Sequence, residues 1–193
     1  MKIVHVCLAN IYVEGWGYQE NIIPRFHSRF GNEVFILTSE YEFDNEKRRS
    51  KRQCMEYTNS DGIKVIALKQ SKRYGYYSKF NDFDSVFEQL CAISPDIIFA
   101  HGGQFIALKD VIKYCRKNKD VKLYIDHHAD YYNAPVNTMK KLFLQRYLYG
   151  YWMRRAVKYT SKFWGVTPWR CNYLSNICKI PEEKIDLLVM GGD

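Results

Sequence analysis

The stretch from residue 96 to residue 126, DIIFAHGGQFIALKDVIKYCRKNKDVKLYID, decides the fold class. It opens with a near-continuous apolar run, 96–100, which is typical of a strand covered on both faces of a sheet. A helix is predicted for 105–118, and a second strand, 122–126, follows after a short link. A strand, a helix and a strand joined by short links predict parallel neighbours with a crossover helix between them.

The same alternation of strands and helices continues on both sides of this stretch. Further strands are predicted at 3–8, 33–38, 62–68, 162–166 and 185–190. Further helices are predicted at 19–30, 83–93, 138–158 and 168–177. The polar segment 39–61 is interpreted as a long surface excursion, and the Tyr-rich segment 73–79 as a loop. The predicted fold class is therefore α/β, a doubly wound parallel sheet of Rossmann-like type, in a single domain of 193 residues.

Composition excludes several classes of protein. No apolar run approaches the roughly 18 to 20 residues of a membrane-spanning helix. The N-terminal MKIVHVCLA contains the polar His5 and is interpreted as a first strand, because a secretory signal needs a longer apolar stretch. The six cysteines contain no CxxC pair and are interpreted as reduced thiols. These features together predict a cytoplasmic protein.

The net charge of +8 is confined to one part of the chain. Between Tyr131 and Pro181 there are nine Lys and Arg and no Asp or Glu, so the remainder has 29 − 9 = 20 basic and 21 acidic residues. Within this region, the helix 138–158 combines basic ends with Leu, Phe, Tyr and Trp. A solvated basic face on a packed helix is one interpretation, and contact with an anionic membrane surface is the other. Nucleic acid is not expected as a partner, because no recognition motif is present.

Parallel sheets of this type bind ligands beyond the carboxyl ends of their strands. Three polar segments follow predicted strands and should meet at this edge. GWGYQEN follows the first strand, HGGQ the fourth and DHHAD the fifth. The candidate residues in these segments are Gly15, Gly17, Tyr18, Gln19, His101, Asp126, His127, His128 and Asp130.

The DHHAD segment, 126–130, allows more than one kind of chemistry. One histidine could present its imidazole to a polar ligand, oriented by Asp126 or Asp130, or the pair could simply pack a loop. The segment also resembles the signature of the DHH phosphoesterases, whose Mn²⁺ site needs several carboxylates. That family's early Asp-x-Asp segment is missing here, so no metal is expected.

The glycines after the first strand do not form a dinucleotide fingerprint. No third glycine stands at the GxGxxG position, residue 20, or in the following Asn21, Ile22 and Ile23. Two glycines still allow the backbone to approach a ligand, and the following helix offers its N-terminus to an anion. A turn that merely needs glycine is the alternative.

Four segments together resemble the N-terminal half of a family 4 glycosyltransferase, the retaining type with a GT-B fold. They are MKIVHVCLANIYVEGWGYQENIIPRFHSRFGNEVFILT, PDIIFAHG, YIDHHADYY and GVTPWRCNYLSNICKIPEEKIDLLVMGGD. Asn32 stands where that family usually has His. The resemblance extends over nearly the whole chain and rests on the order and spacing of the segments.

The resemblance implies transfer of a sugar from a nucleotide-sugar to a hydroxyl acceptor with retention, without an obligatory metal or other cofactor. It implies that Gly15 to Gly17 approach the donor phosphates. It also implies that His128, or else His127, contacts the donor sugar. The predicted catalytic residues are therefore His128, His127 and Asp126. The predicted substrate-binding residues are Gly15, Gly17, Tyr18, Gln19, His101, Asp130 and Arg170.

The resemblance also has a boundary. The family's second, donor-binding domain, with its Glu-x7-Glu pair, has no counterpart in 1–193, so the chain is expected to be one half of such an enzyme and inactive alone. Lipid-linked or membrane-proximal acceptors at the cytoplasmic face are a further expectation. A free-standing, non-catalytic binding module of the same fold is the alternative interpretation.

Overall fold

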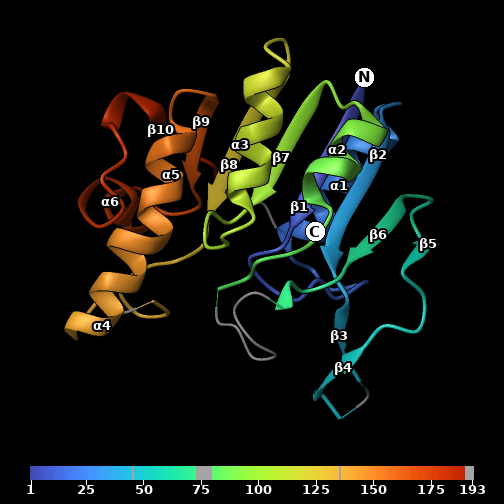
Figure 1. The fold of residues 1–193 in the computed structure, drawn as a ribbon, viewed down its shortest axis with the longest axis horizontal. Coiled ribbons are helices and arrows are strands. Elements are labelled where there is room, and N and C mark those ends of the chain that lie inside the picture. Colours follow the sequence, from blue (N-terminus) through green and yellow to red (C-terminus); the bar gives the residue numbers. More distant parts are fainter. Residues whose placement is uncertain (45, 73–79, 135, 190–193) are drawn as a thin grey trace.

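The computed structural model describes residues 1–44, 46–72, 80–134 and 136–189. In these ranges the chain forms an eight-stranded sheet with the order β10-β9-β8-β7-β1-β2-β6-β5 (Figure 1). Every neighbouring pair is parallel except β5 and β6, which are antiparallel. The α/β class with a mostly parallel sheet, predicted from the sequence, is confirmed.

The elements have the following bounds. The sheet strands are β1 (Lys2–Cys7), β2 (Glu33–Ser39), β5 (Glu56–Thr58), β6 (Lys64–Leu68), β7 (Ile97–His101), β8 (Lys122–His127), β9 (Thr160–Gly165) and β10 (Ile185–Leu187). A separate antiparallel pair is formed by β3 (Tyr41–Phe43) and β4 (Arg49–Lys51). The helices are α1 (Gln19–Arg29), α2 (Val86–Ile93), α3 (Leu108–Lys117), α4 (Met139–Leu142), the π-helix η2 (Phe143–Tyr149), α5 (Gly150–Ala156), α6 (Pro168–Asn176) and the 3₁₀-helix η3 (Glu182–Lys184).

Helices cover the sheet because its strands are apolar on both faces. In Figure 1, α2, α3 and α5 stand side by side in front of the central strands, while α1 contacts β1 and β2. The main core includes Val4 and Val6 of β1 and Ile125 of β8, which are fully buried. The alternate residues of the same strands point to the opposite face, and His5 and Asp126 are among them.

The segment 39–61, interpreted from sequence as a surface excursion, contains three short strands. β3 and β4 pair with each other, and β5 extends the main sheet beyond β6. The element β5 was missed because its three residues, Glu56, Tyr57 and Thr58, alternate polar and apolar character over too short a length. Pairing with β6, which no local pattern shows, decides its structure.

The long helix predicted at 138–158 is present from Met139 to Ala156, but its middle is a π-helix. Thr138 caps its start by accepting a hydrogen bond from the Lys141 backbone. The π-helix ends at Gly150, where a Cβ would lie 3.1 Å from the Gln145 carbonyl oxygen and 3.3 Å from that of Cys178. This close backbone packing favours glycine at position 150.

The topology brings the carboxyl ends of β1, β7 and β8 to one edge. β1 pairs with β7, β7 pairs with β8, and the last registered pair of β7 and β8 joins His101 to Asp126. Predictions for 73–79, Met190, Gly192 and Asp193 lie outside the described residues. Elsewhere in the described ranges, no helix is both long and apolar enough to cross a membrane.

Candidate functional site

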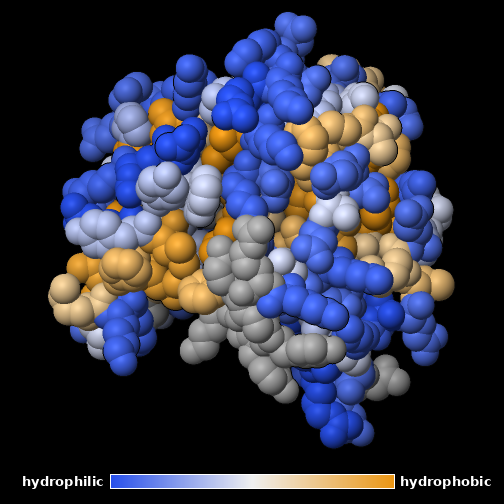
Figure 2. All heavy atoms as spheres, viewed as in Figure 1, coloured by the Kyte–Doolittle hydropathy of each residue, from blue (hydrophilic) through white to orange (hydrophobic). Residues whose placement is uncertain are grey.

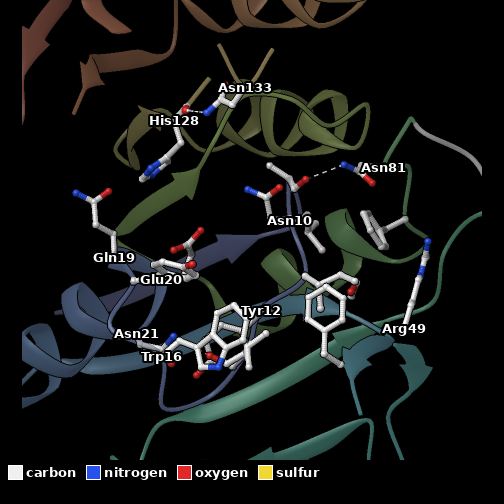
Figure 3. Close-up of a pocket in the computed structure, with 18 of the residues that line it drawn as sticks. Asn10, Tyr12, Trp16, Gln19, Glu20, Asn21, Arg49, Asn81, His128 and Asn133 are labelled. Carbon is white, nitrogen blue, oxygen red and sulfur yellow. Dashed lines mark hydrogen bonds between the residues drawn. The ribbon is translucent and has the colours of Figure 1, made fainter. Parts of the chain in front are cut away.

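A cavity of about 650 Å³ opens at the carboxyl edge of the sheet (Figure 3). Its wall comes from the segment after β1, the start of α1, the β3–β4 pair and the segment after β8. The polar and aromatic lining residues include Asn10, Tyr12, Trp16, Tyr18, Gln19, Glu20, Arg49, Asn81, His128, Asn133 and Arg170. Four predicted site residues therefore line one cavity, namely Tyr18, Gln19, His128 and Arg170.

His128 is the first residue after β8, and its ring points into this cavity on the side of Gln19 and Glu20 (Figure 3). Its Nε2 lies 3.2 Å from Oδ1 of Asp126, which is fully buried at the end of β8. Burial alone would lower the pKa of His128, but the Asp126 carboxylate outweighs burial and the pKa is raised. The arrangement favours an imidazolium whose other nitrogen, Nδ1, is left for a ligand.

Asp126 is held by two hydrogen bonds, from His101 and from the Gly102 backbone. Its Oδ2 lies 2.9 Å from Nδ1 of His101, and its Oδ1 accepts a hydrogen bond of 2.8 Å from the Gly102 backbone. Burial opposes ionisation of Asp126, but His101 and His128 together hold its pKa well below its ordinary value. Asp126 is thus a fixed, buried anion beneath His128.

A chain of histidines runs from Asp126 across this face of the sheet. His101 Nε2 lies 2.9 Å from His5 Nδ1, and His5 Nε2 lies 3.0 Å from His27 Nδ1. A carboxylate can only accept, so a neutral His101 donates from Nδ1 and accepts at Nε2. His5 then donates from Nδ1 to His101 and accepts at Nε2 from Nδ1 of His27. Burial, aided by neighbouring histidines, lowers the pKa of His5 and of His27, which favours neutral rings. Asp126 therefore selects the Nδ1–H tautomer along the chain.

The structure places His101 behind Asp126 rather than at the cavity. The side chain is buried, and both ring nitrogens have partners, Asp126 and His5. The sequence predicted direct contact of His101 with a substrate, but the His101 side chain does not line the cavity. The role that its contacts support is to orient Asp126.

His127 occupies the opposite face of β8, because successive residues of a strand alternate sides. It is fully buried, it stacks on Tyr173 with ring centroids 5.7 Å apart, and neither ring nitrogen has a hydrogen-bond partner among the described residues. Burial, reinforced by the nearby His128, lowers its pKa to about 3. The sequence resemblance implied His128 first and His127 second as the ligand-facing histidine, and the geometry supports His128.

The two glycines of the first loop do not line the cavity themselves. Gly15 adopts a left-handed φ of 79°, which explains the need for glycine there, and a Cβ at Gly15 or Gly17 would meet no atom within 4 Å. The residues between and after them, Trp16, Tyr18 and Gln19, form the wall instead. Approach of donor phosphates to these glycines stays a prediction.

Asp130 and Arg170 form an ion pair at the cavity edge. Arg170 Nε lies 3.3 Å from Asp130 Oδ2, and only Arg170 lines the cavity. Burial opposes ionisation of Asp130, but hydrogen bonds from the backbones of Asn133 and Tyr132 outweigh it and lower its pKa. Arg170 is positioned by α6, whose N-cap Thr167 accepts a hydrogen bond from the Arg170 backbone. Asp130 thus orients a cation rather than a ligand.

One group of three potential metal ligands occurs in the described ranges, and it consists of His101, Asp126 and His128. Their ligand atoms lie within 4.8 Å of one another. A single carboxylate does not suit Mn²⁺, which prefers several oxygen ligands. A metal would also have to displace a hydrogen bond of His101, whose nitrogens are both engaged. The donor set therefore fits a hydrogen-bonded network better than a DHH-type metal centre.

Several cavity residues had not been singled out from sequence. Glu20 lies beside Gln19 at the start of α1, and Arg49 comes from the polar segment 39–61, which had been interpreted as a surface excursion. Asn81, whose φ of 46° is left-handed, donates to the Ala9 carbonyl, and Asn133 donates to the His128 carbonyl. Glu20 belongs to the predicted edge segment GWGYQEN, but no sequence motif marks Arg49, Asn81 or Asn133, because long-range packing brings them to the cavity.

No known protein-family model and no curated protein sequence matches the chain. Solved structures do. A sucrose-phosphate synthase from Thermosynechococcus elongatus matches with a TM-score of 0.57 at 12% identity, over 99% of this chain and 90% of that one. A glycosyltransferase from Rickettsia africae ESF-5 matches with a TM-score of 0.54 at 15% identity, over 96% of this chain but 42% of that one. The chain therefore has the Rossmann-like fold of a glycosyltransferase domain of GT-B type.

Proposed function

We propose that the chain is the acceptor-side domain of a family 4 glycosyltransferase of GT-B architecture, which moves a sugar from a nucleotide-sugar to a hydroxyl acceptor with retention. One observation carries the proposal, namely the pair of His128 and Asp126 at the carboxyl edge of the sheet. His128 lies over a buried carboxylate and in the wall of a cavity of about 650 Å³. The shared fold and the sequence resemblance support the reaction class.

The chemistry of the pair suits departure of a phosphate leaving group. Negative charge develops on the leaving diphosphate as the glycosidic bond breaks, and an imidazolium nearby stabilises it. Asp126, whose Oδ1 lies 3.2 Å from Nε2 of His128, raises the pKa of His128 and so favours the protonated ring. Arg170, on the same wall, adds a second positive charge. No metal is needed for this stabilisation.

The test uses the protein in its natural length and a panel of nucleotide-sugars. Release of nucleoside diphosphate, with water or an added sugar as acceptor, is compared between the parent protein and His128→Ala. The proposal predicts release with at least one donor and its loss in the variant. Release that is equal in both proteins would refute the role of His128, and no release with any donor would refute the reaction class.

We also propose that helix 139–156 contacts an anionic membrane surface, which would place the enzyme at the inner face of the cytoplasmic membrane. Met139, Phe143 and Tyr147 are 81%, 63% and 54% exposed and surround a shallow groove with Lys140 and Leu142. Figure 2 shows apolar atoms gathered over this end of the molecule, where α4 projects from the sheet in Figure 1. Exposed aromatic residues beside lysines suit the headgroup region of anionic lipid.

A further inference from the structure

A second, smaller cavity of about 340 Å³ adjoins the first one at His128. The two share Asn10, Asn81, His128 and Asn133 in their walls, so His128 lies between them. The remaining wall of the smaller cavity comes from Gln104, after β7, from Ala129 and Ala134, after β8, and from residues of the π-helix η2. Neither Gln104 nor the π-helix contributes to the larger cavity.

The lining of the smaller cavity differs in charge from that of the larger one. It contains five carboxamides, those of Asn10, Asn81, Gln104, Asn133 and Gln145, and no Asp, Glu, Lys or Arg. The larger cavity, by contrast, contains Glu20, Arg49 and Arg170. A carboxamide both donates and accepts hydrogen bonds, as a hydroxyl does, and it offers no counter-charge to an ion. Apart from His128, which both cavities share, the lining therefore matches an uncharged ligand that is rich in hydroxyl groups.

The amides are held in place by contacts that leave part of their hydrogen-bonding capacity unused. Gln104 Nε2 donates to Gln145 Oε1 at 2.6 Å, and Asn81 Nδ2 donates to the Ala9 carbonyl at 2.8 Å. Gln145 Nε2, Gln104 Oε1 and Asn81 Oδ1 make no hydrogen bond among the described residues. These three groups supply one donor site and two acceptor sites for hydroxyls.

The π-helix explains why a glutamine is buried at this point. Gln145 is 8% exposed, and it is one of two buried residues of η2, the other being Tyr149. Burying a side-chain amide costs free energy unless the amide is hydrogen-bonded, so an apolar side chain would pack this helix at a lower cost. π-Helical turns inside α-helices occur frequently at functional sites. The local change of helix type and the buried amide thus occur together at the cavity.

We propose that the smaller cavity is a subsite for an uncharged, hydroxyl-rich ligand, a neutral sugar or polyol, bound by Gln104, Gln145 and Asn81. In the context of the proposed glycosyltransferase, on which this role rests, the subsite holds the acceptor beside His128. Sugars carrying an ammonium group are excluded, because the described cavity wall contains no carboxylate and His128 lies in it.

The test is a titration of the ¹⁵N-labelled protein, observed through its side-chain NH₂ resonances. The ligands are methyl glucopyranoside, methyl galactopyranoside and inositol, with glucosamine as the cationic counterpart. The NH₂ signals of Gln104 and Gln145 are assigned from the spectra of Gln104→Leu and Gln145→Leu. We expect these signals to shift with at least one neutral ligand, and either variant to weaken its binding by at least about tenfold.

The matched control is Gln89→Leu, which removes an amide on α2, away from both cavities, and should leave binding unchanged. Gln104→Leu alters a partly exposed residue, so it tests the subsite even if Gln145→Leu does not fold. The inference is overturned if no neutral ligand shifts the two signals, if glucosamine binds equally well, or if both variants bind like the parent. Binding of neutral ligands without any sugar transfer would support the subsite and contradict the proposed glycosyltransferase activity. Sugar transfer without such binding would support the activity and contradict the subsite.

Discussion

His128 shares the buried carboxylate of Asp126 with His101. His128 Nε2 lies 3.2 Å from Oδ1, and His101 Nδ1 lies 2.9 Å from Oδ2. One histidine faces the cavity and the other is buried at the head of a chain that continues through His5 to His27. The carboxylate therefore links the cavity to the interior of the sheet. Its removal should affect both His128 at the cavity and His101 in the interior.

Substitution of Asp126 tests this link. Asp126→Asn keeps the shape but removes the charge, which leaves His128 without its anionic neighbour and disturbs the donor pattern of His101. We expect the free energy of unfolding to fall by about 3 kcal/mol and the pKa of His128 to drop. Urea unfolding measures the first, and NMR titration of the His128 ring measures the second. Asp130→Asn, in a more exposed ion pair, should cost about 1 kcal/mol or less, and equal losses in the two variants would contradict the account.

Stability should depend on pH through the buried neutral histidines. Their pKa values are lowered in the folded protein, so below about pH 6.5 the unfolded chain binds more protons and stability falls as pH falls. For His127, with a pKa of about 3, this loss extends over the window from about 6.5 down to about 3. His128 acts in the opposite sense, because its raised pKa contributes stability that is lost as pH rises through the folded value.

His127→Phe isolates one of these contributions. Phenylalanine keeps the stacking on Tyr173 and removes a titrating ring whose nitrogens have no partner among the described residues. Between about pH 7 and about pH 5, the variant should lose about 2 kcal/mol less stability than the parent. Urea unfolding at the two pH values gives the difference. An unchanged pH slope would show that His127 does not stay neutral in the folded protein.

Arg170 should contribute to binding of a phosphorylated ligand. Its guanidinium lies in the cavity wall and is oriented by Asp130. We expect Arg170→Gln to weaken binding of a nucleoside diphosphate by about tenfold at low salt, as measured by calorimetry. Arg155→Gln, on an exposed residue of α5 away from the cavity, is the matched control for net charge. Equal weakening in both variants would indicate general charge attraction instead of a specific contact.

Contact with a membrane predicts a dependence on lipid charge and on the exposed aromatic residue Phe143. The protein should sediment with vesicles that contain phosphatidylserine and much less with vesicles of phosphatidylcholine alone. Phe143→Ser should reduce binding about tenfold, because a buried ring is lost from the interface. Phe30→Ser is the control, since Phe30 is 80% exposed at the far end of α1. The same sedimentation with both lipids would contradict the proposal.

Local patterns predicted the strands that carry the site but not the packing around it. The apolar runs of β7 and β8 and the polar residues after them were sufficient to predict a ligand-binding edge. A period of two places Asp126 and His127 on opposite faces, but it cannot say which face holds the ligand until the helices are in place. The π-helix gave no pattern of its own, because 138–158 fits ordinary helical spacing. Gln145 therefore could not be identified as a cavity residue from the sequence.

The measurement that tests the central claim most directly is sugar transfer by His128→Ala beside His127→Phe, both in the protein's natural length. The two residues are sequence neighbours, yet only His128 lines the cavity. The account predicts that His128→Ala lowers the rate by about 10²-fold to 10³-fold, while His127→Phe stays within a few-fold of the parent. A fully active His128→Ala, or equal losses in the two variants, would contradict it.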